Sequence, residues 1–192
     1  MLNKLDSHSS LPNIHEIATN FRFIGWINFG LQLSLLVVSG LILLFAIADP
    51  NFNLKAQDPM SWLGLFCAVG GLLILGISLY WDWRYTRIGK ELHSANPALH
   101  PKKADVIHLL WRGLTLNGVG MILTLFGVEA IVGTLVARSL TQVEGLAIYN
   151  ASQLIEPLDM FVVQANINTI LAQFVGIISS AWLISRISYH HH

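Results

Sequence analysis

The sequence predicts an all-α integral membrane protein, built as four transmembrane helices in an antiparallel bundle with a short N-terminal interfacial helix. Three observations lead to this fold class. The 192 residues are 54% hydrophobic and only 11% charged, with a mean hydropathy of +0.58, which is too apolar for an ordinary soluble domain. Four long apolar stretches recur along the chain, and the basic residues gather in alternate connections between them.

Each apolar stretch has the length of a membrane span. About 20 consecutive apolar residues cross the hydrocarbon core of a bilayer as a helix, and no segment long enough for a soluble domain is left over. The expected spans are Phe23 to Ala48, Met60 to Trp81, Leu109 to Ala137 and Met160 to Ile184.

The basic residues predict the orientation of these spans. Nine of them precede the first span, lie between or flank the second and third, or follow the fourth, and two lie on the other side. Because basic residues are retained on the cytoplasmic side of a membrane, both termini are expected to be cytoplasmic. The basic connection after the second span also suits contact with anionic lipid headgroups. The nine residues are Lys4, Arg22, Arg84, Arg87, Lys90, Lys102, Lys103, Arg112 and Arg186, and the two are Lys55 and Arg138.

The two ends of the chain are expected to stand apart from the bundle. Asn13 followed by Glu16 resembles a helix capping box, and apolar residues then recur at helical spacing. Residues 1–21 are therefore expected to be a tail with an amphipathic interfacial helix, with a mobile tail as the alternative, and residues 22–187 the transmembrane domain. The closing histidines resemble a purification tag, so residues 188–192 are taken as a tag-derived tail.

Polar side chains concentrate in the first half of the fourth span. Such groups need partners inside the protein or along a wet cavity, because a bilayer core offers no hydrogen bonds. They are either contacts between helices or part of a polar pathway at membrane depth. Helical periodicity places Asp159, Asn166, Gln173 and Ser180 on one stripe, and Gln164 with Asn168 on the opposite side.

The other spans carry seams of small or polar residues that would let helix backbones approach closely. Glu129 is the exception, because it lies in the outer half of the third span, opposite its small-residue stripe. A carboxylate there must pair, take a proton or meet water. The seams include Asn28, Gln32 and Ser39 in the first span, Gly64, Ala68, Gly71 and Ser78 in the second, and Gly113, Asn117, Gly120, Thr124 and Gly127 in the third.

No nucleophile elbow, phosphate-binding loop, dinucleotide fingerprint or zinc-protease motif occurs in the sequence, so an enzyme is not expected and no catalytic or cofactor-binding residue is assigned. Oxygen ligands suit hard cations, and imidazole suits iron, zinc or copper. Their spacing fits no specific metal template. The candidates for a metal site or polar pathway are Glu129, Asp159, Gln164, Asn166, Asn168, Gln173, Asn117, Gln32 and His108.

Four segments carry a resemblance to a known family: FRFIGWINFGLQL, LTLNGVGMILTLFGVEAIVGTL, ARSLTQ and MFVVQANINTILAQF. They resemble a four-span family shared by cyanobacteria and chloroplasts, that of the 21-kDa inner-envelope translocon protein, also called Permease In Chloroplasts. Members of this family have been proposed as iron permeases and, alternatively, as parts of the protein-import machinery. With no transit leader at its start, the chain is expected to come from a cyanobacterium and to reside in the plasma or thylakoid membrane.

Two functions follow from the residues and the resemblance together. The first is a permease for a divalent metal such as iron, with the metal as substrate and no resident cofactor. The alternative is a non-transporting subunit of a protein translocon, or an assembly factor of photosynthetic membranes. In both cases membrane lipid, further copies of the chain and a membrane-complex partner are the expected contacts, and nucleic acid is not. A pigment- or lipid-binding role is a third option.

Overall fold

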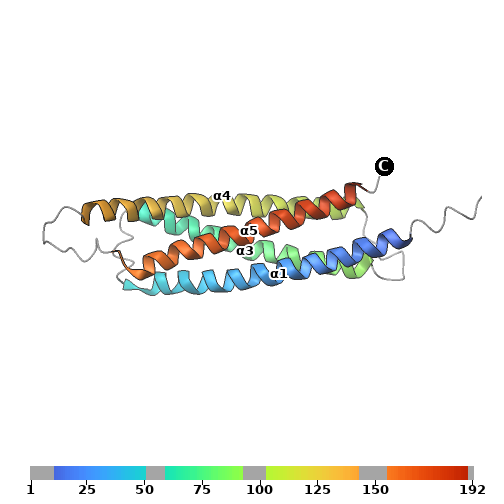
Figure 1. Ribbon diagram of the computed structural model, residues 1–192, viewed down its shortest axis with the longest axis horizontal. Coiled ribbons are helices and arrows are strands. Elements are labelled where there is room, and N and C mark those ends of the chain that lie inside the picture. The colour runs from blue at the N-terminus through green and yellow to red at the C-terminus, as the bar shows by residue number, and fades with distance from the viewer. Residues whose placement is uncertain (1–10, 51–58, 93–102, 143–154, 190–192) are drawn as a thin grey trace, which may run out of the picture.

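The computed structural model describes residues 11–50, 59–92, 103–142 and 155–189, and these ranges form four long helices without a strand among them (Figure 1). The expected all-α class is therefore confirmed. The predicted basic connection, the outer connection at 143–154 and the chain ends lie largely outside the described residues. The helices are α1 (Leu11–Ala48), α3 (Pro59–Leu92), α4 (Lys103–Gln142) and α5 (Pro157–Tyr189).

All four helices are long and apolar enough to cross a membrane, which confirms an integral membrane protein. Their candidate spans are Arg22–Ala48, Pro59–Arg87, Ala104–Leu140 and Pro157–Ile187. Each contains one of the predicted stretches. The second span continues beyond the predicted end at Trp81 and so includes Asp82 and Tyr85.

The N-terminal segment is continuous with the first span. Helix α1 runs unbroken from Leu11 to Ala48, so the residues expected to form a separate interfacial helix are its first turns. The side chains of residues 11–18 lie outside the described ones, and a position in the membrane interface stays a prediction.

The helices pack in a closed ring of four. Helix α1 packs against α3 and α5, and α4 packs against the same two neighbours, while α3 and α5 touch only weakly across the diagonal. Along the α3–α4 seam, Gly64 meets Ile131, Gly71 meets Thr124 and Gly113 meets Tyr85. Residue numbers thus rise along α3 as they fall along α4.

The core of the bundle has three layers. All four helices contribute to an apolar cluster at the end of the bundle that contains Leu43, Leu65, Ile131 and Val162. A second apolar cluster, around Tyr85, Leu110 and Leu183, lies toward the other end. The layer between them is polar and almost fully buried, and it contains Asn28, Gln32, Ser78, Asn117, Thr124 and Gln173.

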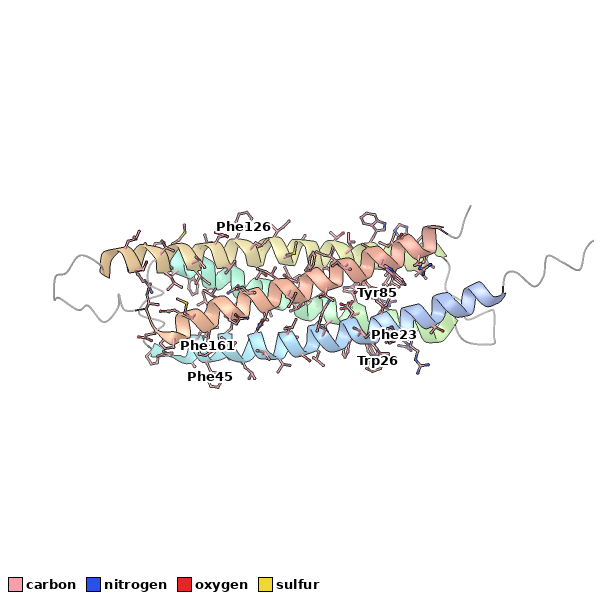
Figure 2. All side chains as sticks on the ribbon, in the orientation of Figure 1. Phe23, Trp26, Phe45, Tyr85, Phe126 and Phe161 are labelled. Carbon is pink, nitrogen blue, oxygen red and sulfur yellow. The ribbon has the colours of Figure 1, made fainter. Side chains whose placement is uncertain are left out.

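The outside of the bundle is largely apolar. Figure 2 shows Phe45 and Phe126 projecting away from the helices and Tyr85 lying among them. The exposed fractions agree, at 69% for Phe45, 67% for Phe126 and 1% for Tyr85. This surface is the one that lipid covers in a membrane protein, where polar groups are drawn to the inside of the bundle.

Candidate functional site

The buried polar layer is the best-defined chemical feature of the structure. On one side of it, Gln32 Nε2 donates a hydrogen bond of 3.2 Å to Asn28 Oδ1, one turn earlier on α1. The single hydrogen of Ser78 Oγ on α3 has two acceptors within reach, Gln32 Oε1 at 3.2 Å and the Leu75 carbonyl at 2.8 Å. The Gln32 amide therefore ties α1 to α3 at the centre of the bundle.

Gln173 makes the corresponding connection on the other side of the layer. Its Nε2 donates to the Gly71 carbonyl of α3 across 3.1 Å, and Thr124 Oγ1 of α4 lies 3.4 Å from its Oε1. A Cβ atom at Gly120 would lie 2.5 Å from Gln173 Nε2. A side chain at position 120 would therefore displace the Gln173 amide from this position.

Helix α5 reaches the same layer through Gly176. A Cβ atom there would lie 2.5 Å from Gln32 Nε2 and 2.6 Å from Asn117 Nδ2. Asn117 Nδ2 donates to the Gly113 carbonyl on its own helix across 3.0 Å. Residues from all four helices thus meet in one buried cluster, whose polar groups lie against glycine backbone.

Asp82 and its neighbours extend this cluster toward the second apolar layer. Asp82 is 1% exposed and lies beside the Asn28 amide, but neither its Oδ2 nor Asn28 Nδ2 makes a hydrogen bond of standard geometry with a described residue. The hydroxyls of Tyr85 and Ser180 are buried beside each other near Gly113, and neither makes a hydrogen bond of standard geometry with a described residue. Every described Arg and His side chain is exposed or half-buried. A lone buried carboxyl of this kind needs a proton or a counter-charge.

Sequence reasoning missed Asp82 and Tyr85 as site residues, because the second span was expected to end at Trp81. The signal was present in the spacing. The small-residue seam of that span, Gly71 and Ser78, continues at helical intervals to Asp82 and Tyr85. Extending the helical spacing of Gly71 and Ser78 beyond Trp81 would have placed both Asp82 and Tyr85 inside the bundle.

A second set of polar residues lies on the outer surface of the helices. Glu129 is exposed on α4, opposite its packed glycines. Gln164 is exposed on α5, and its Nε2 donates a hydrogen bond of 3.0 Å to Asn168 Oδ1, one turn later. Sequence analysis expected these two amides to find a neighbouring helix or cavity, but they are joined to each other by one hydrogen bond on their own helix.

The remaining candidates are scattered. Asp159 Oδ2 accepts a hydrogen bond of 2.8 Å from the Glu156 backbone N–H, which is the arrangement of a capping box at the start of α5. Asn166 is buried, and its Nδ2 donates to the Val162 carbonyl across 2.9 Å. His108 is exposed on α4. In the described part of the chain, no three His, Cys, Asp or Glu side chains come together as metal ligands would.

The candidate residues thus divide into a buried group and an outward group. Gln32, Asn117 and Gln173 are brought together inside the bundle, with Asp82, Asn28 and Ser78. Glu129, Gln164 and Asn168 are not part of that cluster.

Comparison with known proteins gives a family for this arrangement. Residues 11–188 match the model of the family described as "Protein of unknown function (DUF3611)". The chain belongs to this family. The match covers all four helices, so the buried cluster and the outward residues both lie within the family's domain.

One curated relative supports the same assignment. Protein TIC 21, chloroplastic, from Arabidopsis thaliana is 34% identical over 180 residues. The aligned region takes in 91% of this chain and 59% of that relative, so this chain spans about three fifths of its length. The resemblance noted from the four sequence segments is confirmed. No solved structure matches the chain.

Proposed function

We propose that this protein is a non-transporting subunit of a membrane protein complex, of the kind found in a protein translocon or in the assembly of photosynthetic membranes. The similarity to Protein TIC 21 supports this function more than the metal permease that the sequence also suggested. The observation that carries the proposal is the closed packing of the bundle interior.

Helix contacts through glycine close the outer half of the bundle. A Cβ atom at Gly127 of α4 would lie 3.1 Å from both the Ala68 backbone nitrogen and the Gly64 carbonyl oxygen of α3. Backbones this close leave no room for a file of water between α3 and α4. Ser39 Oγ of α1 likewise donates directly to the Ala165 carbonyl of α5 across 3.0 Å.

The polar layer supports the same conclusion from the middle of the bundle. Gln32 Oε1 and Gln173 Nε2 each take part in a contact between helices, which is the usual role of buried amides in membrane bundles. A pathway would instead leave such groups facing water. We infer that the layer holds the four helices in register and that partners bind the outside of the bundle.

We also propose an antiparallel bundle with both termini in the cytoplasm. Arg22, Arg84, Arg87, Arg112 and Arg186 lie near one end of the helices, and Arg138 lies near the other. Three of these arginines stack on tryptophans of the same end, with Arg186 Cζ 5.3 Å from the Trp182 ring. Amphipathic aromatic and basic side chains are expected together at the cytoplasmic interface.

Two measurements on the full chain test the proposed function. A photo-crosslinking residue at the exposed Val119 or Ile122 of α4, compared with one at the buried Leu75, should capture a discrete membrane protein from native membranes only from the outside positions. Radiolabelled iron uptake into proteoliposomes should not exceed that of empty liposomes. Uptake that falls in Gln32→Leu, with that variant shown to be folded, would overturn the proposal in favour of a permease.

A further inference from the structure

The Glu129 carboxyl lies in the middle of an apolar surface. Exposed Val132, Val136 and Leu140 separate it from the nearer end of α4, and eleven residues of helix correspond to about 16 Å. Phe126 covers the other side and is 67% exposed. No hydrogen bond or ion pair joins Glu129 to another described residue. A carboxyl at such a depth is costly in contact with lipid, and a glutamate side chain is too short to reach across this distance to water.

The amide pair on α5 lies at the same level as Glu129. Contacts between α4 and α5 pair Gly113 with Ser180, Asn117 with Gly176 and Gly120 with Gln173. Each step along α4 is matched by an equal step back along α5. Continuing this register by about nine residues along each helix places Glu129 opposite Gln164. Both residues are exposed, but no hydrogen bond joins them within one chain.

The chemistry of the two groups is complementary. Gln164 Nε2 uses one hydrogen in its bond to Asn168 Oδ1. The Asn168 Nδ2 group keeps both of its hydrogens, since it donates no hydrogen bond to another described residue, and a carboxyl oxygen is a strong acceptor for them. Glu129 on α4 and the amide pair on α5 are thus complementary polar groups at the same depth. Since they do not bind each other within one chain, each can bind its counterpart on another molecule.

We propose that a second copy of this chain supplies that partner, with Glu129 of one copy binding the Gln164–Asn168 pair of the next. Copies related by rotation about the membrane normal keep every residue at its own depth. A carboxyl and an amide pair that are level in one chain are therefore level between chains. The contact joins α4 of one copy to α5 of another. A two-fold dimer that makes the contact twice and a closed ring that makes it head-to-tail both satisfy it.

The surface around Glu129 permits close approach of another helix. Gly118 and Gly133 lie on the same face of α4, and a Cβ atom at either would have nothing within 4 Å. These glycines open outward, unlike the packed Gly120 and Gly127. The inference goes beyond the proposed function and does not depend on it, because self-association needs no other protein.

The proposal is tested by measuring self-association of the purified full chain in phosphatidylcholine–phosphatidylglycerol liposomes by energy transfer between labelled copies. Glu129→Leu and Asn168→Leu should each weaken association by about three- to twentyfold, the range of interhelical hydrogen bonds. The double variant should be no weaker than either single one, because both remove the same contact. Ser34→Ala is the control, since Ser34 is exposed on α1 and bonded only to its own helix.

Disulfide trapping tests independently which helices of two copies face each other. In a Cys67→Ala background, copies with Phe126→Cys are mixed with copies carrying Ile167→Cys, both of which are exposed positions. The proposal expects crosslinks between 126 and 167 of different copies. Crosslinks from 126 to 126 alone, additive losses in the double variant, or a chain that stays monomeric at all densities would each overturn it. Helicity and thermal unfolding of every variant confirm that it is folded.

Discussion

The buried amides and the outward amides of this bundle differ in what they bind. Gln173 reaches across two helix boundaries, to the Gly71 carbonyl and to Thr124. Gln164, nine residues earlier on the same helix, bonds only to Asn168 one turn away. The comparison shows that a polar residue in a membrane span can hold the fold together or remain available to a partner, according to the face it occupies.

The same contrast separates the glycines. Gly127 touches the backbone of α3, while Gly133, six residues later on α4, opens onto empty space. Small residues on the inner face allow helices of one chain to pack, and small residues on the outer face are open to another chain. Two predictions test this division and a third tests the buried side alone, and they are given from the largest expected effect to the smallest.

Gly127→Val should cause the largest loss of stability. Its side chain would meet the Ala68 and Gly64 backbones, which cannot rotate away, and overpacking of this kind costs about 1–3 kcal/mol or more. Denaturant unfolding in detergent micelles, followed by tryptophan fluorescence, measures the effect. The matched variant is Gly133→Val, which should change the free energy of unfolding by less than about 0.5 kcal/mol. Equal losses in the two variants would refute the division of faces.

Gln173→Leu should have an intermediate effect. It removes two contacts between helices, and an interhelical hydrogen bond in a membrane protein contributes about 0.6 kcal/mol on average, with a maximum near 1.7. Gln164→Leu is its matched control on α5, and it should leave the unfolding free energy of the monomer nearly unchanged. A Gln164→Leu variant that unfolds as readily as Gln173→Leu would show that the outward pair also supports the fold.

Asp82→Asn should have the smallest effect, and of the opposite sign. The amide keeps the shape of the side chain but removes a carboxyl with an unpaired Oδ2. Burying an amide costs less free energy than burying a carboxyl that can ionise, so the change is expected to be neutral or slightly stabilising. Thermal unfolding in detergent gives the sign. A marked loss of stability would mean that the carboxyl has a role that an amide cannot take over.

Much of the fold could be predicted because membrane spans are read from composition. Four apolar stretches fixed the number of helices, and helical spacing correctly placed Asn166, Gln173 and Ser180 on the buried side of α5 and Gln164 on the outside. Periodicity works here because the helices are straight enough for one face to stay inside along most of their length.

The buried cluster could be predicted only in part. Gln32, Asn117 and Gln173 were candidates because amides are conspicuous in an apolar run. Asp82 was missed because a charged residue was taken as the end of a span, although burial depends on the face of the helix as well as on its composition. Which residues of different helices meet, as Ser78 meets Gln32, depends on helix register, and that is set by packing at glycines rather than by any local pattern.

The single cysteine of the chain reports on opening of the contact between α3 and α4. Cys67 is buried, and its Cβ lies 3.1 Å from the position that a Cβ atom at Gly127 would occupy. A thiol reagent can therefore modify it only when the two helices part, so the rate of labelling counts how often they do. The chain carries this reporter without any introduced cysteine. A ligand or partner that tightens or loosens the contact between α3 and α4 would therefore change the labelling rate of Cys67.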